Sequence, residues 1–188
     1  PRSTPLYSSA ASDVYKRQIQ GMGLTYATSN RGACHLRSYT VSSEILGIPE
    51  KTDPLVTDEK AGLVKAFQDV TAAWDSTGLC LFTSFAWSLD NVAPHIDSAC
   101  EGDWDADRLM ETGERIWNLE RDFNMRAGLT AADDTLPKRL LEEGANTGPA
   151  EGKVSGLAEM LPEYYKERGW RQDGNLSDET RQRLRLPG

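Results

Sequence analysis

Cysteine and histidine are scarce in this sequence of 188 residues, which contains three cysteines and two histidines. The cysteines, Cys34, Cys80 and Cys100, lie far apart, and no CxxC or HxxxH pair occurs. An odd number of cysteines without paired spacing is a poor disulfide framework, so we expect a reducing, cytoplasmic setting. Any metal ion or cluster bound here would need ligands from elsewhere.

Basic residues and long apolar runs are also in short supply. Lys and Arg number 21 against 29 Asp and Glu, which gives a net charge of -8. This balance argues against nucleic-acid phosphates and anionic membrane surfaces as partners. No apolar run approaches the roughly 20 residues that a membrane-spanning helix requires. With 38% hydrophobic residues, the composition fits a soluble globular protein with a core.

The first eighteen residues, PRSTPLYSSAASDVYKRQ, are rich in Ser and Ala and show no amphipathic period. The part SSAASDVYKRQ resembles a translated sequencing-adapter string, which predicts that residues 1–18 are an artefact. A disordered tail is the alternative. We expect the natural chain to begin near Ile19, with residues 19–188 forming the folded region and with upstream protein missing.

Helical periodicity dominates the rest of the sequence. After Thr57, which can cap a helix, Leu63, Phe67, Val70 and Trp74 recur at spacings of 4, 3 and 4. A longer helix is predicted over residues 105–126.

The predicted 105–126 helix has one apolar stripe, formed by Leu109, Thr112, Ile116, Leu119 and Phe123. Its other face is expected to be solvated and carries Arg108, Glu111, Glu114, Arg115 and Arg121.

Shorter helices are predicted over residues 42–46, after Pro137, with Pro162 in a first turn, and after Ser177. Strand-like alternation is almost absent, so the fold class is mainly α. Two stretches stay open: residues 21–37 fit a helix containing glycines or a loop that closes on a ligand, and residues 79–85 are ambiguous.

The string Asp75-Ser76-Thr77-Gly78-Leu79-Cys80 directly follows the first predicted long helix. A carboxylate at the negative end of a helix needs a partner, either local donors or a ligand that carries N–H groups. Gly78 allows the backbone to approach a ligand, and Cys80 offers a thiolate for iron or zinc. A surface acid, a capping glycine and a buried free cysteine are the simpler interpretation.

A second cluster, Arg31-Gly32-Ala33-Cys34-His35-Leu36-Arg37, places two arginines around a histidine. Guanidinium groups bind phosphate through two parallel hydrogen bonds. His35 is suited to proton transfer near neutral pH. A core histidine and two surface arginines would give the same pattern.

These strings resemble tungsten-dependent aldehyde ferredoxin oxidoreductases. The similarity is carried, in order, by RGACHLRSYTVSSEILG, WDSTGLCLF, NLERDFNMRAGLTAADDTLPKR and LPEYYKERGW. It runs from about Ile19 to the end of the chain. It implies the C-terminal helical domains of that fold, without the N-terminal domain that contains β-structure.

The resemblance also implies roles for individual residues. Asp75, Leu79 and Leu81 would hold a pterin of the tungstopterin, or of its molybdopterin relative. Cys80 would be the fourth ligand of a [4Fe-4S] cluster, and His35 a proton-transfer group near the metal.

Two further positions, Arg31 and Arg37, would flank the same pocket and contact pterin phosphate or ring atoms. The family's CxxCxxxC run, which supplies the other three cluster ligands, does not occur in this sequence.

The implied function is therefore that of a C-terminal fragment of an aldehyde-oxidising enzyme that passes electrons to ferredoxin, inactive by itself. Its remaining cluster cysteines would come from the missing N-terminal domain. Two alternatives stay open. One is a non-catalytic helical scaffold or subunit-contact module. The other is a hydrolase that uses His35 with Cys34 or Cys80, although no oxyanion motif is evident.

Overall fold

The structure, a computed structural model, describes residues 19–187. The segment 1–18, predicted to be an artefact or a tail, lies outside the described residues. The α-helices are α2 (Gln20–Thr28), α3 (Lys60–Ser76), α4 (Leu89–Ala99), α5 (Ala106–Arg126), α6 (Lys138–Glu142), α7 (Leu157–Arg168) and α8 (Asp178–Arg183). Short helical turns are η1 (His35–Arg37), η2 (Ser42–Leu46), η3 (Leu81–Phe85) and η4 (Ala131–Asp133).

The fold is mainly α, as predicted: residues 19–187 contain only isolated β-bridges and no strand. None of the helices within that range is long and apolar enough to cross a membrane.

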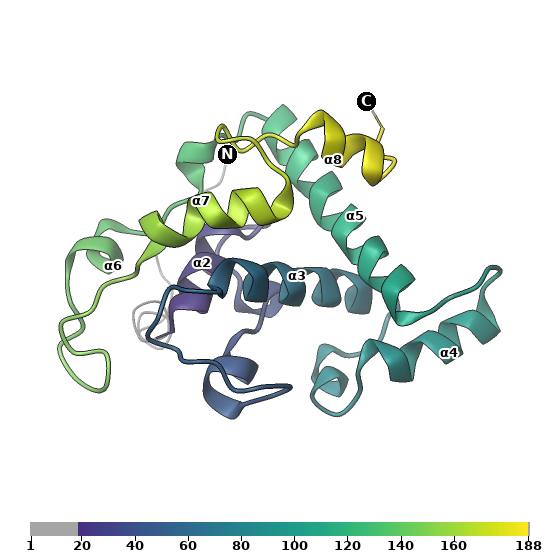
Figure 1. Cartoon of the computed structure of the whole chain (residues 1–188), viewed down its shortest axis with the longest axis horizontal. Helices are drawn as coiled ribbons and strands as arrows, with labels where there is room; N and C mark the ends of the chain where they lie inside the picture. Colours follow the sequence, from purple (N-terminus) through teal and green to yellow (C-terminus); the bar gives the residue numbers. More distant parts are fainter. Residues whose placement is uncertain (1–18, 188) are drawn as a thin grey trace.

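Helices α3 and α5 cross at the centre of the molecule, with α7 and α2 packed against α3 and α4 against α5 (Figure 1). The crossing is close because Gly113 of α5 faces the backbone of α3. A Cβ atom at Gly113 would lie 1.9 Å from the carbonyl oxygen of Asp69. The glycine therefore sets the distance between the two central helices.

Two apolar clusters lie at opposite ends of α3. The larger joins α2, α3, α5 and α7 around buried residues such as Met22, Val64, Trp117 and Tyr164. The smaller joins the end of α3 to α4 and α5 around Trp74, Leu89, Val92 and Leu109.

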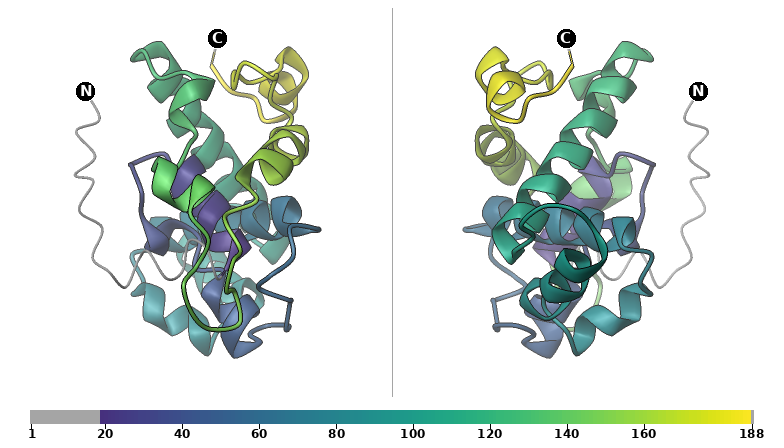
Figure 2. Two further views of the ribbon diagram at one scale, coloured as in Figure 1. Left: turned by 90° about the vertical axis from the view of Figure 1, so that its left-hand side faces the viewer. Right: turned by 90° about the vertical axis from the view of Figure 1, so that its right-hand side faces the viewer.

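The region after α6 lies away from the helical body: Figures 1 and 2 show the loop between α6 and α7 projecting outward.

Most predicted helices are confirmed, with differences at their ends. Thr57 does not cap α3, because the helix begins at Lys60 after Glu59, and the Thr57 hydroxyl instead donates to Glu159 across 2.9 Å. Ser177 does cap α8, where its Oγ accepts from the Thr180 amide.

Helix α7 begins at Leu157, so Pro162 lies inside the helix rather than in its first turn.

The prediction for the two faces of α5 is partly wrong. Glu114 and Arg121, expected in solvent, are 9% and 1% exposed, whereas Leu119 and Phe123 of the apolar stripe are 38% and 72% exposed. The buried charges have partners that sequence periodicity does not reveal. Arg121 donates to both carboxylate oxygens of Asp134 at 2.8 and 2.6 Å.

Glu114 is paired in the same way with bases from two other helices. It accepts hydrogen bonds from Arg183 at 2.9 and 3.0 Å and lies 3.2 Å from the Lys65 ammonium. Burial opposes its charged form, but Arg183 and Lys65 outweigh burial and lower the pKa of Glu114 to about 2. The carboxylate is therefore part of the packing between α3, α5 and α8.

Each ambiguous stretch is part helix and part loop. Residues 21–37 contain α2 followed by a loop and η1, and residues 79–85 end in η3. Helix α4 has no counterpart among the predicted helices, since Pro94 interrupts its sequence pattern.

Candidate functional site

Asp75 lies at the surface near the C-terminal end of α3, and the loop of residues 77–80 follows it. Gly78 has a φ of 75°, a left-handed conformation that turns the chain out of the helix. The loop is fixed by Trp74, whose Nε1 donates to the Cys80 carbonyl across 3.2 Å. The Cys80 side chain itself is exposed as a free thiol. The loop thus presents an accessible sulfur.

Arg37 is brought to this loop from η1. Its Nη1 donates to Oδ2 of Asp75 across 2.9 Å, and its Nη2 donates to Oε2 of Glu120 across 2.6 Å. The guanidinium carbon lies 5.3 Å from the centroid of the Trp117 ring. Arg37 is therefore buried and divided between two acids, and Asp75 has the partner that its place at a helix end requires.

One donor of Arg37 is left over. The Arg37 side chain is only 7% exposed, and its Nε is buried without a hydrogen-bond partner. A buried donor without an acceptor is unusual in a folded protein. The side chain of Asp75, at 42% exposed, lies beside it and is open to a ligand.

Glu120 is a site residue that the sequence did not indicate. It lies within the matched string NLERDF, but a charged residue on a long helix is ordinarily solvated. Its Oε2 also accepts from Asn30 across 3.3 Å, and Asn124 donates to the Asn30 carbonyl across 2.6 Å. Helix α5 thus contacts both segments that carry the candidate arginines, the one next to Arg31 and the one that contains Arg37.

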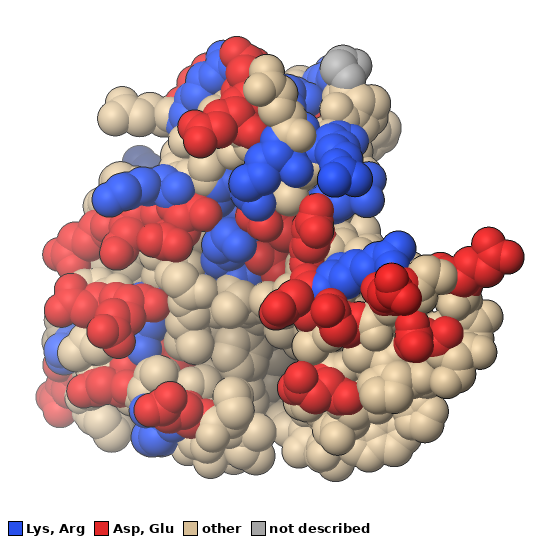
Figure 3. All heavy atoms as spheres, turned by 45° about the vertical axis from the view of Figure 1, so that its right-hand side comes forward, with Lys and Arg blue, Asp and Glu red and all other residues tan. Residues whose placement is uncertain are grey.

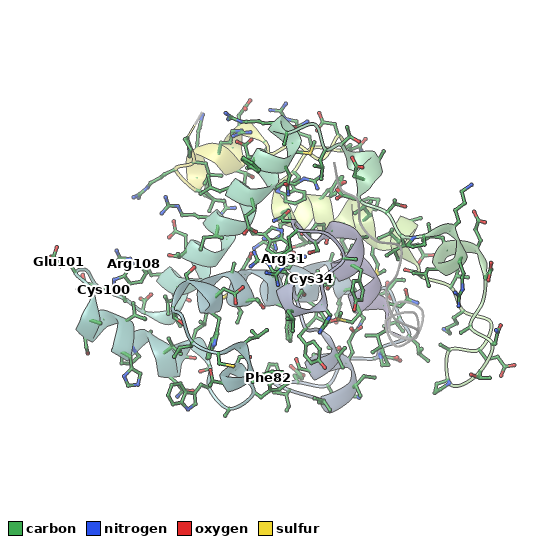
Figure 4. All side chains as sticks on the ribbon, turned by 180° about the vertical axis from the view of Figure 1, so that it is seen from behind. Arg31, Cys34, Phe82, Cys100, Glu101 and Arg108 are labelled. Carbon is green, nitrogen blue, oxygen red and sulfur yellow. The ribbon has the colours of Figure 1, made fainter. Side chains whose placement is uncertain are left out.

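Arg31 is not part of the Arg37 ion pairs. Its side chain is exposed, and Nη2 lies 3.2 Å from Sγ of Cys34 (Figure 4). Arg31 also lines a shallow hollow of about 400 Å³ with Leu119, Glu120 and Phe123. Cys100 lies far from these residues, at the outer end of α4 (Figure 4).

His35 and Leu81 lie on the wall of a larger cavity of about 680 Å³. The cavity is lined by aromatic side chains from several segments: Tyr39, Phe67, Trp74, Phe82, Phe85 and Trp87. Neighbouring rings contact one another in a series, with centroid distances of 6.0 Å from His35 to Tyr39 and 5.9 Å from Tyr39 to Phe85.

The candidate residues therefore form two adjoining surfaces. One is polar and carries Asp75 and Arg37; the other is apolar and carries His35. The loop of Leu79, Cys80 and Leu81 joins them.

A complete metal site is not formed by this part of the chain. Within residues 19–187, no group of three or more His, Cys, Asp or Glu side chains is placed to hold a metal ion. Cys80 is available as one ligand only.

Comparisons with known proteins identify the family of the chain. A family model for aldehyde ferredoxin oxidoreductase, domains 2 and 3, matches residues 9–186. The tungsten-containing aldehyde ferredoxin oxidoreductases of Pyrococcus horikoshii and Pyrococcus furiosus are each 49% identical, over 172 and 170 residues, which cover 90% and 89% of this chain. The chain spans 28% of the length of each relative.

A solved structure supports the fold alone. The active site complex BamBC of benzoyl coenzyme A reductase, in complex with 1,5-dienoyl-CoA, matches with a TM-score of 0.57 and 23% sequence identity. The match covers 73% of this chain and 20% of that chain. On the evidence of the family model and the sequence identities, this chain belongs to the aldehyde ferredoxin oxidoreductase family.

Proposed function

We propose that this chain forms the C-terminal part of an enzyme that oxidises an aldehyde with water to a carboxylic acid. The reaction releases two electrons and two protons for each aldehyde, and ferredoxin is the proposed electron acceptor. A tungstopterin, when bound, supplies the two-electron chemistry, and a [4Fe-4S] cluster passes the electrons on. The observation that carries the proposal is that the DSTGLC segment adjoins the segment that holds His35 and Arg37, although the two are distant in sequence.

The polar half of the site fits a pterin. Such a ring offers N–H donors, and the site offers the exposed carboxylate of Asp75, which the guanidinium of Arg37 holds in place. In this proposal Asp75 accepts from the ring, and Arg37 donates to a ring or phosphate acceptor. Backbone groups of Leu79 and Leu81 and the exposed guanidinium of Arg31 complete the contacts.

Cys80 fits the role of a single cluster ligand. Its thiol is exposed, and its backbone is held by Trp74, so sulfur can be presented without rearranging the loop. A four-iron cluster takes four such ligands. The other three must come from protein beyond the described residues.

His35 is placed to move a proton. Its imidazole lies on the cavity wall beside Leu81, at the junction between the polar and apolar surfaces. An imidazole nitrogen there can accept a proton from the attacking water and release it to solvent, since His35 is exposed.

A chimaeric enzyme tests the proposal. Residues 19–188 would replace the corresponding C-terminal region of the Pyrococcus furiosus relative, which is similar enough for the interface to be kept. We expect the purified chimaera to contain tungsten, pterin and four iron atoms for each chain, and to reduce ferredoxin when an aldehyde is added.

The ligand assignment is tested in the same chimaera by Cys80→Ser, with Cys100→Ser as the matched control because both thiols are free and exposed. Cys80→Ser should lose iron or alter the electron paramagnetic resonance spectrum of the cluster, and Cys100→Ser should not. An unchanged spectrum in Cys80→Ser would refute the assignment. A chimaera that folds without binding pterin would refute the function.

A further inference from the structure

The backbone carbonyl of Cys80 accepts three hydrogen bonds, although a carbonyl oxygen has only two lone pairs. The Trp74 indole donates to it across 3.2 Å, the Thr83 hydroxyl across 2.6 Å and the Thr83 amide across 3.0 Å. We propose that Trp74 and Thr83 are positioning residues, which keep the thiolate of Cys80 on the iron that it would ligate. The inference rests on the proposed function and concerns the stability of its cluster.

Trp74 holds both ends of the loop that follows α3. Its own carbonyl accepts from the Thr77 hydroxyl across 2.7 Å, and that hydroxyl accepts from the Leu79 amide across 3.2 Å. The Trp74 indole then donates to Cys80 at the other end. Because Trp74 is fully buried in the smaller apolar cluster, these bonds tie the loop to the core of the protein.

Charge plays no part in holding this stretch. Residues 76–89 contain no charged side chain, so none of them forms an ion pair. Part of the stretch lines the cavity beside His35, and Figure 3 shows a hollow at the lower centre of one face whose visible atoms are uncharged. Leu79 and Leu81 pack against the smaller cluster, but the side chain of Cys80 is exposed. The hydrogen bonds to its carbonyl are therefore the contacts that fix the ligand residue itself.

A ligand residue that already has its binding conformation favours retention of the iron. If the loop takes up that conformation for only part of the time, the apparent affinity falls in proportion to that fraction. Loss of one ordinary hydrogen bond changes such an equilibrium about fivefold. Removing either side-chain donor from Cys80 should therefore loosen one of the four irons and leave the other three in place.

The order of the loop can be tested in the chain without a cofactor. A nitroxide label on Cys80, in a chain that carries Cys34→Ser and Cys100→Ser, reports the motion of the loop through its electron paramagnetic resonance line shape. We expect Thr83→Val and Trp74→Phe to make the label more mobile. Thr83→Ser, which keeps the hydroxyl donor, should leave the label as it is in the parent. Unchanged mobility in both Thr83→Val and Trp74→Phe overturns the proposal.

The loop between α4 and α5 supplies a matched control. There the Trp104 indole donates to the Glu101 carbonyl across 3.2 Å, beside the exposed thiol of Cys100 (Figure 4). Trp104→Phe removes the same kind of hydrogen bond and should leave a label on Cys80 unchanged. If it mobilises that label as much as Trp74→Phe does, the effect is a general loosening and the proposal is wrong.

Folding of the variants is checked by circular dichroism. Trp74 is buried, so Trp74→Phe is interpreted only if its spectrum matches that of the parent. Thr83 is exposed, and Thr83→Val changes its shape little, so this variant keeps the test decisive if Trp74→Phe does not fold.

Retention of the iron is tested in the chimaera. A [4Fe-4S]2+ cluster that releases Fe2+ and gives one electron to ferricyanide becomes [3Fe-4S]+, which has its own electron paramagnetic resonance signal. We expect Thr83→Val to form this three-iron signal about fivefold faster than the parent, and Thr83→Ser to form it at the parent rate. A parent rate in Thr83→Val overturns the positioning role.

The same experiment separates this proposal from the function on which it rests. A chimaera that oxidises aldehyde, and in which Thr83→Val and Trp74→Phe keep the fourth iron as the parent does, overturns the positioning roles and leaves the function standing. A chimaera that binds no cluster overturns the proposed function, and with it the role in iron retention.

Discussion

Arg37 and Asp75 are separated by 38 positions in the sequence, yet Nη1 of Arg37 donates to Oδ2 of Asp75 across 2.9 Å. Glu120 takes the other arm of the same guanidinium at 2.6 Å. Because the guanidinium is divided, it does not chelate both oxygens of Asp75. One oxygen of Asp75 is thereby left available to a ligand, and we propose that Glu120 positions the guanidinium of Arg37.

Replacing Glu120 should therefore weaken pterin retention without removing a pterin contact. In Glu120→Gln the charge-assisted hydrogen bond to Arg37 becomes neutral. Because Glu120 is partly exposed, we expect this change to cost about 1 kcal/mol of pterin-binding free energy, which corresponds to about fivefold weaker retention. Retention is measured as pterin fluorescence released by denaturing the chimaera after dialysis.

The control for that measurement is Glu111→Gln, an exposed acid on the same helix. Asp75→Asn serves as the reference for losing a direct contact. If Asp75→Asn loses pterin and Glu120→Gln retains it fully, the positioning role of Glu120 is wrong while the pterin site stands.

His35 is expected to affect turnover rather than cofactor content. In the chimaera, His35→Gln should keep tungsten and pterin but lower kcat about 100-fold, a typical loss for a proton-transfer group. Its pH–rate profile should also differ from that of the parent, because glutamine cannot carry the transferred proton.

The other histidine of the chain provides the matched control for this variant. His95 is stacked on Trp87, at 6.1 Å between ring centroids, and does not line the cavity. His95→Gln should leave both kcat and the pH profile unchanged. A pH profile of His35→Gln that overlays the parent profile would contradict the proton-transfer role.

The sequence predicted the helices that have regular apolar spacing. Helix α5 begins at Ala106, one residue from the predicted start, and the side chain of Asp105 caps it by accepting from the Arg108 amide. The faces of the same helix were not predictable in this way. Arg121 is buried because Asp134 neutralises it, and that pairing depends on tertiary structure.

The sequence indicated which segments carry candidate site residues, but not how their side chains are arranged. Nothing in the spacing of Asp75, Arg37 and Glu120 indicates that one guanidinium joins the two acids. The apolar spacing along α3 predicted a helix but not what its apolar residues contact. In the structure Phe67 and Val70 are half-buried and line the cavity, so a periodic stripe does not distinguish packing from ligand binding.

Acid should weaken the fold through Glu114. Its pKa falls from 4.5 to about 2 on folding, so its contribution is present above about pH 4.5 and is lost as the pH falls towards 2. The shift corresponds to roughly 3 kcal/mol at most. The test is urea unfolding of the parent chain and of Glu114→Gln at pH 7 and at pH 3. We expect the variant to be less stable than the parent at pH 7. We also expect the variant to lose less unfolding free energy than the parent between pH 7 and pH 3. Glu111→Gln should follow the parent chain at both.

Replacing two glycines of α3 and α5 by alanine should change the stability of the chain in opposite directions. Gly113→Ala should destabilise the chain by about 3 kcal/mol, because the new methyl group would meet the carbonyl oxygen of Asp69 and push the two helices apart. Gly62→Ala, on the exposed side of α3 with nothing within 4 Å of the new Cβ, should instead stabilise the helix by about 0.5–1 kcal/mol. Urea midpoints of the two variants measure both effects. A Gly113→Ala midpoint equal to that of the parent would show that the helices are not in backbone contact at this position.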